Sequence, residues 1–327
     1  MKLIFVHGHT QLDCDALELK KKWTDALKTG LSRSGLSMPI SKNDIELPYF
    51  GALLQGLATS ANWALEQTVK QANISHHEET RLIHDFLLEV AKNTGINIQQ
   101  MAIDLAIPDQ KRSPLNWAWV TAILESLDKQ MNWGELSIRR FIYELFCYLT
   151  DPVLRVRLND IVKNQIDEEP CVVVGHGMGS IIAYNVMMEN PHLQVSRLIT
   201  LGNPMGLQSI SAYLNPISIP KSLRGDWYNV QDDLDPFAQR SITITSSAAT
   251  YDIHHHGGLR SRTKNHHDME GYLNDQTVGR QVYDALAAEP KKSSNGILQY
   301  LKTSAILGPY LAAACEFELF GCLLSYY

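Results

Sequence analysis

Residues 171–184 read Cys171-Val172-Val173-Val174-Gly175-His176-Gly177-Met178-Gly179-Ser180-Ile181-Ile182-Ala183-Tyr184, and this stretch decides the fold. A short apolar run rich in valine leads into glycines at alternate positions, and a second apolar segment follows them. The first run is typical of a buried strand, the glycines of a tight turn and the second run of a helix. The stretch therefore predicts the strand–turn–helix unit from which α/β folds are built.

The turn has the spacing of the Gly-x-Ser-x-Gly nucleophile elbow, in which a strained turn lifts a serine hydroxyl above the edge of a sheet. Gly175 and Gly179 occupy the two glycine positions, but Gly177 stands where the serine would be. The sequence therefore predicts an elbow without its nucleophile. Ser180 lies three positions further on. We expect it to point away from the tip of the turn, toward packing or a helix cap.

The turn has two other interpretations besides the elbow. The spacing Gly175-x-Gly177-x-x-Ser180 approximates the dinucleotide-binding fingerprint. However, the third glycine is replaced, and the next predicted strand runs into Gly202-Asn203-Pro204 without an acidic residue to bind a ribose. The third interpretation is a glycine turn that serves only strand-to-helix packing. It would explain the turn, but it would not explain the other motifs of the chain that match the elbow interpretation.

The apolar pattern predicts the other elements of a mainly parallel sheet with helices on both faces. Strands separated by segments long enough for a crossover favour parallel pairing. Pro48 indicates an edge position for the second strand. Strands are predicted at residues 3–6, 44–49, 171–174, 197–201, 226–230 and 241–245, and amphipathic helices at 15–35 and 276–288.

A long helical segment interrupts this alternation. Residues 57–168 have helical spacing almost throughout, and prolines at 108, 114 and 152 divide the segment into separate helices. We therefore expect residues 1–56 and 169–288 to form the α/β core and residues 57–168 to form a helical insertion or cap. The tryptophans of the insertion suggest an apolar substrate, although core packing also accounts for each of them singly.

The C-terminal residues differ in composition from the rest. Residues 289–296 are typical of a linker, and residues 297–327 form an apolar tail. Its longest uncharged run, residues 303–315, is too short to span a bilayer. We expect the tail to pack on the domain or on a partner in preference to contacting a membrane.

The overall composition excludes some functions. The chain of 327 residues has a net charge of −6, which gives no electrostatic basis for binding nucleic acid. Its five cysteines are odd in number and contain no Cys-x-x-Cys pair. This favours free thiols in a reducing compartment, and the first strand begins too early for a cleavable signal peptide. We expect a cytoplasmic protein.

Candidate partners for the elbow follow it in the order nucleophile, acid, histidine that α/β-hydrolases use. Asp235 lies in a proline-bounded turn beyond the predicted strand 226–230, and Asp232 is the alternative acid. His267 is the preferred base because it lies in a short polar loop near the Gly-Tyr-Leu run, and His266 is the alternative. Ordinary turn-forming aspartates and surface histidines would account for each residue alone.

Two backbone N–H groups are needed to stabilise the oxyanion of an acyl-transfer reaction. The N–H of Met178 directly follows the nucleophile position. The second donor would come from the loop after the first strand, where His7-Gly8-His9-Thr10 makes the N–H of His9 the natural candidate.

Together these motifs resemble the α/β-hydrolase superfamily, and most closely bacterial serine hydrolases that are similar to lipases and esterases. The resemblance rests on residues 3–8, 172–180 and 201–204, on the Asp235 loop and on Asn265-His266-His267. It implies hydrolysis of an ester, thioester or amide of a small-molecule or acyl substrate, without a cofactor. Gly177 departs from the pattern, so the implied activity does not carry over to the chain as written.

Two explanations of that departure stay open, together with one hypothesis of a different class. The chain is either an inactivated form of an active hydrolase or a natural non-catalytic relative that binds a ligand in the old site. Alternatively, His254-His255-His256 and His266-His267-Asp268 would form a metal site. Their spacing matches no standard zinc pattern, so we expect no metal.

Overall fold

The computed structural model describes residues 1–8, 15–58, 77–114, 116–131, 135–166, 169–214, 216–244 and 252–288. All of them belong to one compact unit, Met1–Glu289. The predicted linker 289–296 and the tail 297–327 lie outside the described residues. Within the described part of the chain, no helix combines the length and apolar character needed to cross a bilayer.

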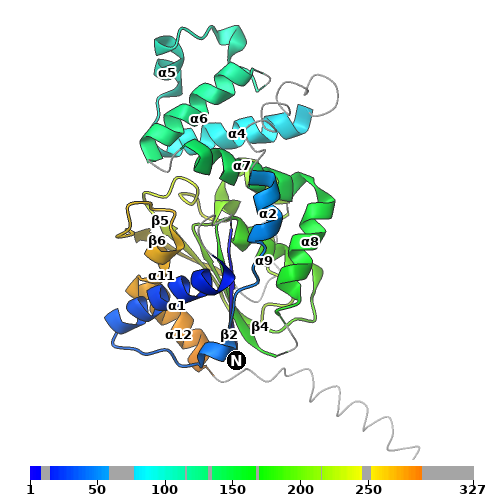
Figure 1. Cartoon of the computed structure of the whole chain (residues 1–327), viewed down its shortest axis with the longest axis vertical. Helices are drawn as coiled ribbons and strands as arrows, with labels where there is room; N and C mark the ends of the chain where they lie inside the picture. Colours follow the sequence, from blue (N-terminus) through cyan, green and yellow to red (C-terminus); the bar gives the residue numbers. More distant parts are fainter. Residues whose placement is uncertain are drawn as a thin grey trace, which may run out of the picture. The chain divides into compact units, whose positions relative to one another are not determined.

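The described residues form a six-stranded sheet of order β2-β1-β3-β4-β5-β6 (Figure 1). Each neighbouring pair of strands is parallel, so the predicted α/β fold with a mainly parallel sheet is confirmed. The strands are β1 Lys2–Val6, β2 Ile45–Glu46, β3 Cys171–His176, β4 Val195–Leu201, β5 Trp227–Asp232 and β6 Ile253–Leu259.

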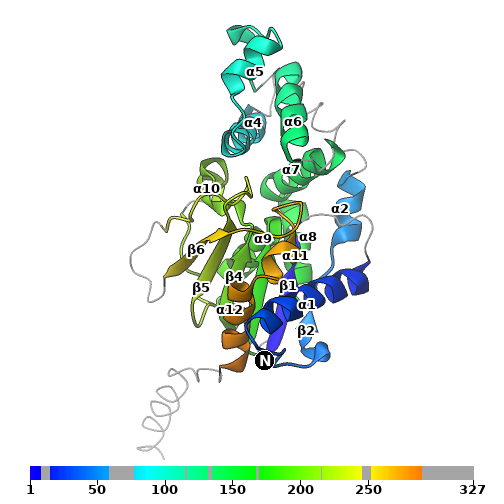
Figure 2. The same ribbon diagram turned by 90° about the vertical axis from the view of Figure 1, so that its left-hand side faces the viewer.

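Helices cover both faces of this sheet, and further helices lie beyond the carboxyl ends of its strands (Figures 1 and 2). The helices are α1 Ala16–Arg33, α2 Gly51–Ala58, α4 His77–Asn93, α5 Ile98–Asp104, α6 Trp117–Met131, α7 Glu135–Thr150, α8 Pro152–Lys163, α9 Met178–Glu189, α10 Gln208–Leu214, α11 Met269–Leu273 and α12 Gln276–Ala287. Short 3-10 helices occupy Lys42–Asp44, Asp109–Lys111 and Pro204–Gly206.

Alternation along the strands divides the buried side chains between two cores. Ile4 of β1 and its register partner Val173 of β3 face the core that α9 completes. Leu3 and its partner Val172 face the opposite core, which is closed by α1, α11 and α12. Because successive side chains of a strand point to opposite faces, apolar runs such as those of β1 and β3 require helices on both sides.

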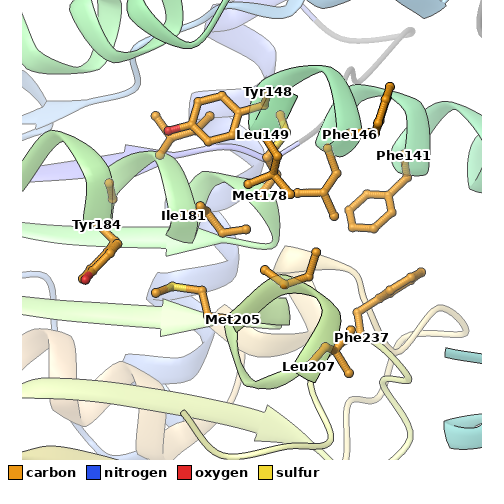
Figure 3. Packing of buried hydrophobic residues seen from close by; sticks show 14 of the residues in the cluster. Phe141, Phe146, Tyr148, Leu149, Met178, Ile181, Tyr184, Met205, Leu207 and Phe237 are labelled. Atoms are coloured by element: carbon orange, nitrogen blue, oxygen red, sulfur yellow. The ribbon is translucent and has the colours of Figure 1, made fainter. Parts of the chain in front are cut away.

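The core on the α9 side extends beyond the sheet into the helices that precede β3. Phe146 and Leu149 of α7 pack in the same cluster as Met178 and Ile181 of α9 (Figure 3). This packing brings α7 against the start of α9, which is the end of that helix nearest to the glycine turn. The packing thus places side chains of the predicted insertion beside the elbow.

The two edge strands of the sheet differ in how well the sequence predicted them. Residues 241–244 form no strand, so the strand predicted at 241–245 is wrong, and the sixth strand is β6 at Ile253–Leu259. β6 was missed because its histidines and glycines give no apolar alternation. Histidines and glycines can nevertheless form this strand, because β6 is an edge strand whose side chains are mostly exposed or half-buried. β2 is the other edge strand, as predicted.

The close crossing of α9 over the end of β1 can be tested at Gly179. A Cβ there would contact the carbonyl oxygen of Val6 and lie 2.5 Å from that of His7. Since these atoms belong to the backbone of the central sheet, Gly179→Ala should lower the free energy of unfolding by about 2–3 kcal/mol, as overpacking does. Urea denaturation would measure this.

Gly257→Ala is the matched control, because no heavy atom lies within 4 Å of a Cβ at that position of β6. It should change the free energy of unfolding by less than about 0.5 kcal/mol. Equal effects of the two substitutions would contradict the close crossing.

Candidate functional site

The turn between β3 and α9 has the backbone geometry that the elbow interpretation requires. Gly177 has φ 53° and ψ −125°, and its N–H donates to the carbonyl of Leu201 over 3.0 Å. A positive φ of this kind costs most residues of order 1–3 kcal/mol and is easily adopted by glycine. A Cβ at Gly175 would lie only 2.7 Å from the Cα of Ser180, so the turn is as tight as the sequence predicts.

His267 lies directly beside this turn. A Cβ built on Gly177 would be 3.1 Å from Nε2 of His267. The other ring nitrogen, Nδ1, is 2.8 Å from Oδ2 of Asp235, and the side chains of both residues are almost completely buried. The structure therefore brings together the three residues that the sequence selected as nucleophile position, acid and base.

A buried tyrosine holds the acid in place. The hydroxyl of Tyr272 donates to Oδ2 of Asp235 over 2.7 Å, and the N–H of Phe237 donates to Oδ1 over 3.0 Å. Burial, and then the charge of Asp235, raise the pKa of Tyr272 well above its ordinary value. The phenol therefore stays protonated at neutral pH and donates to the carboxylate. Tyr272 is the tyrosine of the Gly-Tyr-Leu run, for which the sequence predicts no role of its own.

The loop that carries His267 is held by three further hydrogen bonds. Nε2 of His176 donates to the carbonyl of His267 over 2.7 Å, because a carbonyl oxygen only accepts. The N–H of His267 donates to Oδ1 of Asn265, and Nδ2 of Asn265 donates to Oδ1 of Asp268. His176 is the variable residue between the first two elbow glycines, so the elbow itself positions the base.

The alternative acid and base pair with each other. Nδ1 of His266 is 3.2 Å from Oδ2 of Asp232. Asp232 also accepts from the N–H groups of Ser261 and Leu234, which ties together the loops after β5 and β6. Asp232 is completely buried, whereas the His266 side chain is 29% exposed. The candidate acids and bases thus form one His–Asp pair each way, His266 with Asp232 and His267 with Asp235, and the His267 pair borders Gly177.

The candidate oxyanion donors are only partly described. Met178 is the first residue of α9, where the leading N–H groups of a helix have no acceptor within the helix. A Cβ on Gly8 would lie 2.9 Å from the nitrogen of Met178, so the loop after β1 runs directly against this helix start. The next residue of that loop, His9, lies outside the described residues.

Two phenylalanine rings and a glycine that the sequence did not predict for this site also lie close to His267 or to Asp235. The rings of Phe141 and Phe237 lie 5.3 and 5.0 Å from that of His267, centroid to centroid, in edge-on arrangements. Phe141 comes from α7, and Phe237 follows the Asp235 turn. Gly202 has φ 57°, and its Cβ would lie 3.0 Å from Oδ2 of Asp235. A glycine at the end of a predicted strand is a signal that could have identified this last contact.

A pocket of about 380 Å³ opens beside His267. It lies between the C-terminal ends of α4 and α6 and the loops after β5 and β6. Its lining consists of Asn93, Thr94, Gln130, Met131, Leu234, Pro236, Gln239, Lys264, Asn265, His266 and His267.

The metal hypothesis gains no support from the described part of the chain, in which no three His, Cys, Asp or Glu side chains form a metal-binding group. His254 stacks on Tyr228 with ring centroids 4.8 Å apart. His255 contacts the carbonyl of Ile242 through Nε2 over 3.1 Å. These side chains of β6 therefore have structural contacts of their own.

Ser180 is no substitute for the missing nucleophile. It is completely buried in the first turn of α9, with its Cα against Gly175 of β3. Its Oγ has no hydrogen-bond partner among the described residues. The hydroxyl of Ser180 is therefore enclosed within the packing of β3 against α9.

Comparison with models of known protein families gives no match for this sequence. Comparison with curated proteins gives none either.

Asp268 supplies a test of the loop that positions His267. Burial, and next the charge of Glu270, raise the pKa of Asp268 to about 6 from an ordinary value of 3.8. A raised carboxyl pKa means that the folded state binds more protons than the unfolded state between these values. This stabilisation is complete below the unfolded pKa and is lost as the pH rises through 6.

Asp268→Asn removes this titration and keeps an acceptor for Asn265. Because the group is partly exposed, we expect wild type to lose roughly 1–2 kcal/mol relative to the variant between pH 4 and pH 7. Urea denaturation of both proteins at several pH values would measure the difference. A stability difference that stays constant over this range would contradict the raised pKa.

Proposed function

We propose that this chain carries an α/β-hydrolase-type site for an ester, thioester or amide, in which Gly177 replaces the nucleophile. The observation that supports the proposal most directly is the 3.1 Å separation between His267 Nε2 and the position of a residue-177 Cβ. A side-chain oxygen at this position would meet a histidine whose other nitrogen is bound to a buried aspartate. As written, the site binds substrate and hydrolyses it only at a background rate.

The chemistry that a serine at position 177 would perform follows from these contacts. Its Oγ would attack the carbonyl carbon while Nε2 of His267 takes the hydroxyl proton, and Asp235 would stabilise the resulting imidazolium. The N–H groups of Met178 and His9 would hold the oxyanion. Collapse would expel the leaving group with the proton from His267, and water would hydrolyse the acyl-serine by the same steps.

The substrate would meet aromatic side chains next to His267. Phe141, Phe237 and Phe86 form an aromatic wall, with ring centroids of successive pairs 4.6 and 5.9 Å apart. This wall supports an apolar acyl group next to His267. We propose that α4 to α7 act as the cap that closes over that group, and that no cofactor takes part.

The alternative function, a non-catalytic relative that binds a ligand, is favoured by the burial of the site. Gly177 is buried, and a Cβ on it would lie 3.8 Å from the ring of Phe141. Phe141 and His267 are each about 1% exposed. An active site covered in this way must open to admit a substrate, whereas a retained ligand pocket beside it need not.

Restoring the serine separates these functions. Gly177→Ser should react with fluorophosphonate probes at residue 177 and hydrolyse short activated esters such as nitrophenyl acetate, whereas the chain as written should do neither. Active-site labelling followed by mass spectrometry would locate the reaction. His267 must retreat by a few tenths of an ångström to accommodate the new Cβ.

Gly177→Ala is the matched control, since it adds the same Cβ without a nucleophile. Both substitutions should lower the free energy of unfolding by roughly 1–3 kcal/mol because of the positive φ, and only the serine variant should label. A folded serine variant that neither labels nor turns over esters would support the non-catalytic alternative.

The choice between the two His–Asp pairs is testable in the Gly177→Ser protein. His267→Ala should lower kcat/KM by at least about 10⁴-fold because the base is lost, and Asp235→Asn by about 10³–10⁴-fold because the base is misoriented. His266→Ala should cost less than about tenfold, since its ring pairs with Asp232 instead. If His266→Ala abolishes turnover and His267→Ala does not, the assignment is wrong.

A further inference from the structure

We infer that the pocket beside His267 binds an uncharged, polyhydroxylated group, so that the ligand is an ester or amide of a sugar or a similar polyol. The inference rests on the proposed function for the position of the reacting carbonyl. The pocket itself is defined independently of that function by its lining side chains and by a volume of about 380 Å³. This volume lies within the usual range for small-molecule sites.

The lining is dominated by neutral hydrogen-bonding side chains. They are Asn93, Thr94, Gln130, Gln239 and Asn265. No carboxylate of a described residue lines the pocket. Met131, Leu234 and Pro236 add apolar surface between them. Amide and hydroxyl groups next to apolar patches match the alternating polar edges and C–H faces of a hydroxylated ring.

Hydrogen bonds within the protein determine which donor and acceptor atoms of the lining remain available to a ligand. Nε2 of Gln239 donates to the carbonyls of Asn93 and Asp233, which uses both of its amide hydrogens. The hydroxyl of Thr94 donates its only hydrogen to the carbonyl of Ala91 over 2.7 Å. The oxygens Oε1 of Gln239 and Oγ1 of Thr94 therefore remain as acceptors. Acceptors of this kind match the hydroxyl donors of a polyol.

The charges around the pocket offset one another. Lys264 is the exposed cation of the lining. The C-termini of α4 and α6 carry partial charge of the opposite sign. These helices end at Asn93 and Met131, which line the pocket. Each helix C-terminus carries roughly −0.5 of an elementary charge. These two ends partly offset the charge of Lys264, and no carboxylate of a described residue lines the pocket to bind a cation.

The test uses the protein with Gly177 in place, which under the proposed function binds esters without consuming them. Isothermal titration calorimetry would compare 6-O-acetylglucose with cyclohexylmethyl acetate, in which the hydroxylated ring is replaced by a hydrocarbon ring. We expect at least about tenfold tighter binding of the sugar ester, as two or more additional hydrogen bonds provide. A third compound, the cyclohexane ester bearing a carboxylate, tests for an anion site.

A substitution in the pocket localises the effect. Thr94→Val conserves the volume of the side chain and removes an acceptor, so it should weaken 6-O-acetylglucose binding about fivefold without a comparable loss for cyclohexylmethyl acetate. Thr29→Val is the matched control, because Thr29 on α1 also donates to a backbone carbonyl of its own helix and does not line the pocket. It should leave the preference for the sugar ester as it is.

Each outcome decides between the two proposals. Equal affinities for the two neutral esters, tighter binding of the carboxylate, or no binding of any compound at millimolar concentration would overturn the polyol inference. Should Gly177→Ser nevertheless hydrolyse simple esters, the proposed function would stand without it. If the sugar ester binds preferentially while the serine variant stays inactive, the pocket is a polyol site and the hydrolase proposal fails.

Discussion

The absence of side chains where β3 turns into α9 is the constraint on which the rest of the site depends. A Cβ at Gly175 would meet the start of α9, and one at Gly179 would meet the end of β1. Glycines at these positions therefore let β1, β3 and α9 approach one another more closely than residues with a side chain would allow. Between these two positions Gly177 has a positive φ, and a Cβ on it would lie 3.1 Å from Nε2 of His267.

Hydrogen bonds from several elements then hold the base at that point. Asp235, in the turn after β5, contacts Nδ1 of His267, and His176 of β3 donates to the carbonyl of the same residue. Tyr272 of α11 in turn donates to Asp235. Removing one member of such a buried polar network lowers stability, because its partners lose their hydrogen bonds in a medium of low dielectric constant. Our proposal of acyl hydrolysis rests on this support of His267 beside Gly177.

The two sides of His267 differ in chemistry. Phe141 and Phe237 close the side toward Gly177, while the pocket at the ends of α4 and α6 presents amide and hydroxyl groups. An ester of an apolar acid with a hydroxylated partner would satisfy both sides together. The helices before β3 contribute side chains to each side, so in the proposed function they would select the ligand and the sheet would position the reacting bond.

The sequence by itself determined the α/β fold, five of the strands and the order of Gly177, Asp235 and His267, because apolar runs and glycine spacing are local patterns. β6 escaped prediction, since an exposed edge strand needs no apolar alternation. Only the tertiary structure decided which histidine pairs with which aspartate, because neighbouring residues of one loop are equivalent in sequence and differ only in what packs against them. The contacts of Phe141 and Tyr272 and the amide-lined pocket likewise come from segments far apart in the chain, and no local pattern encodes their meeting.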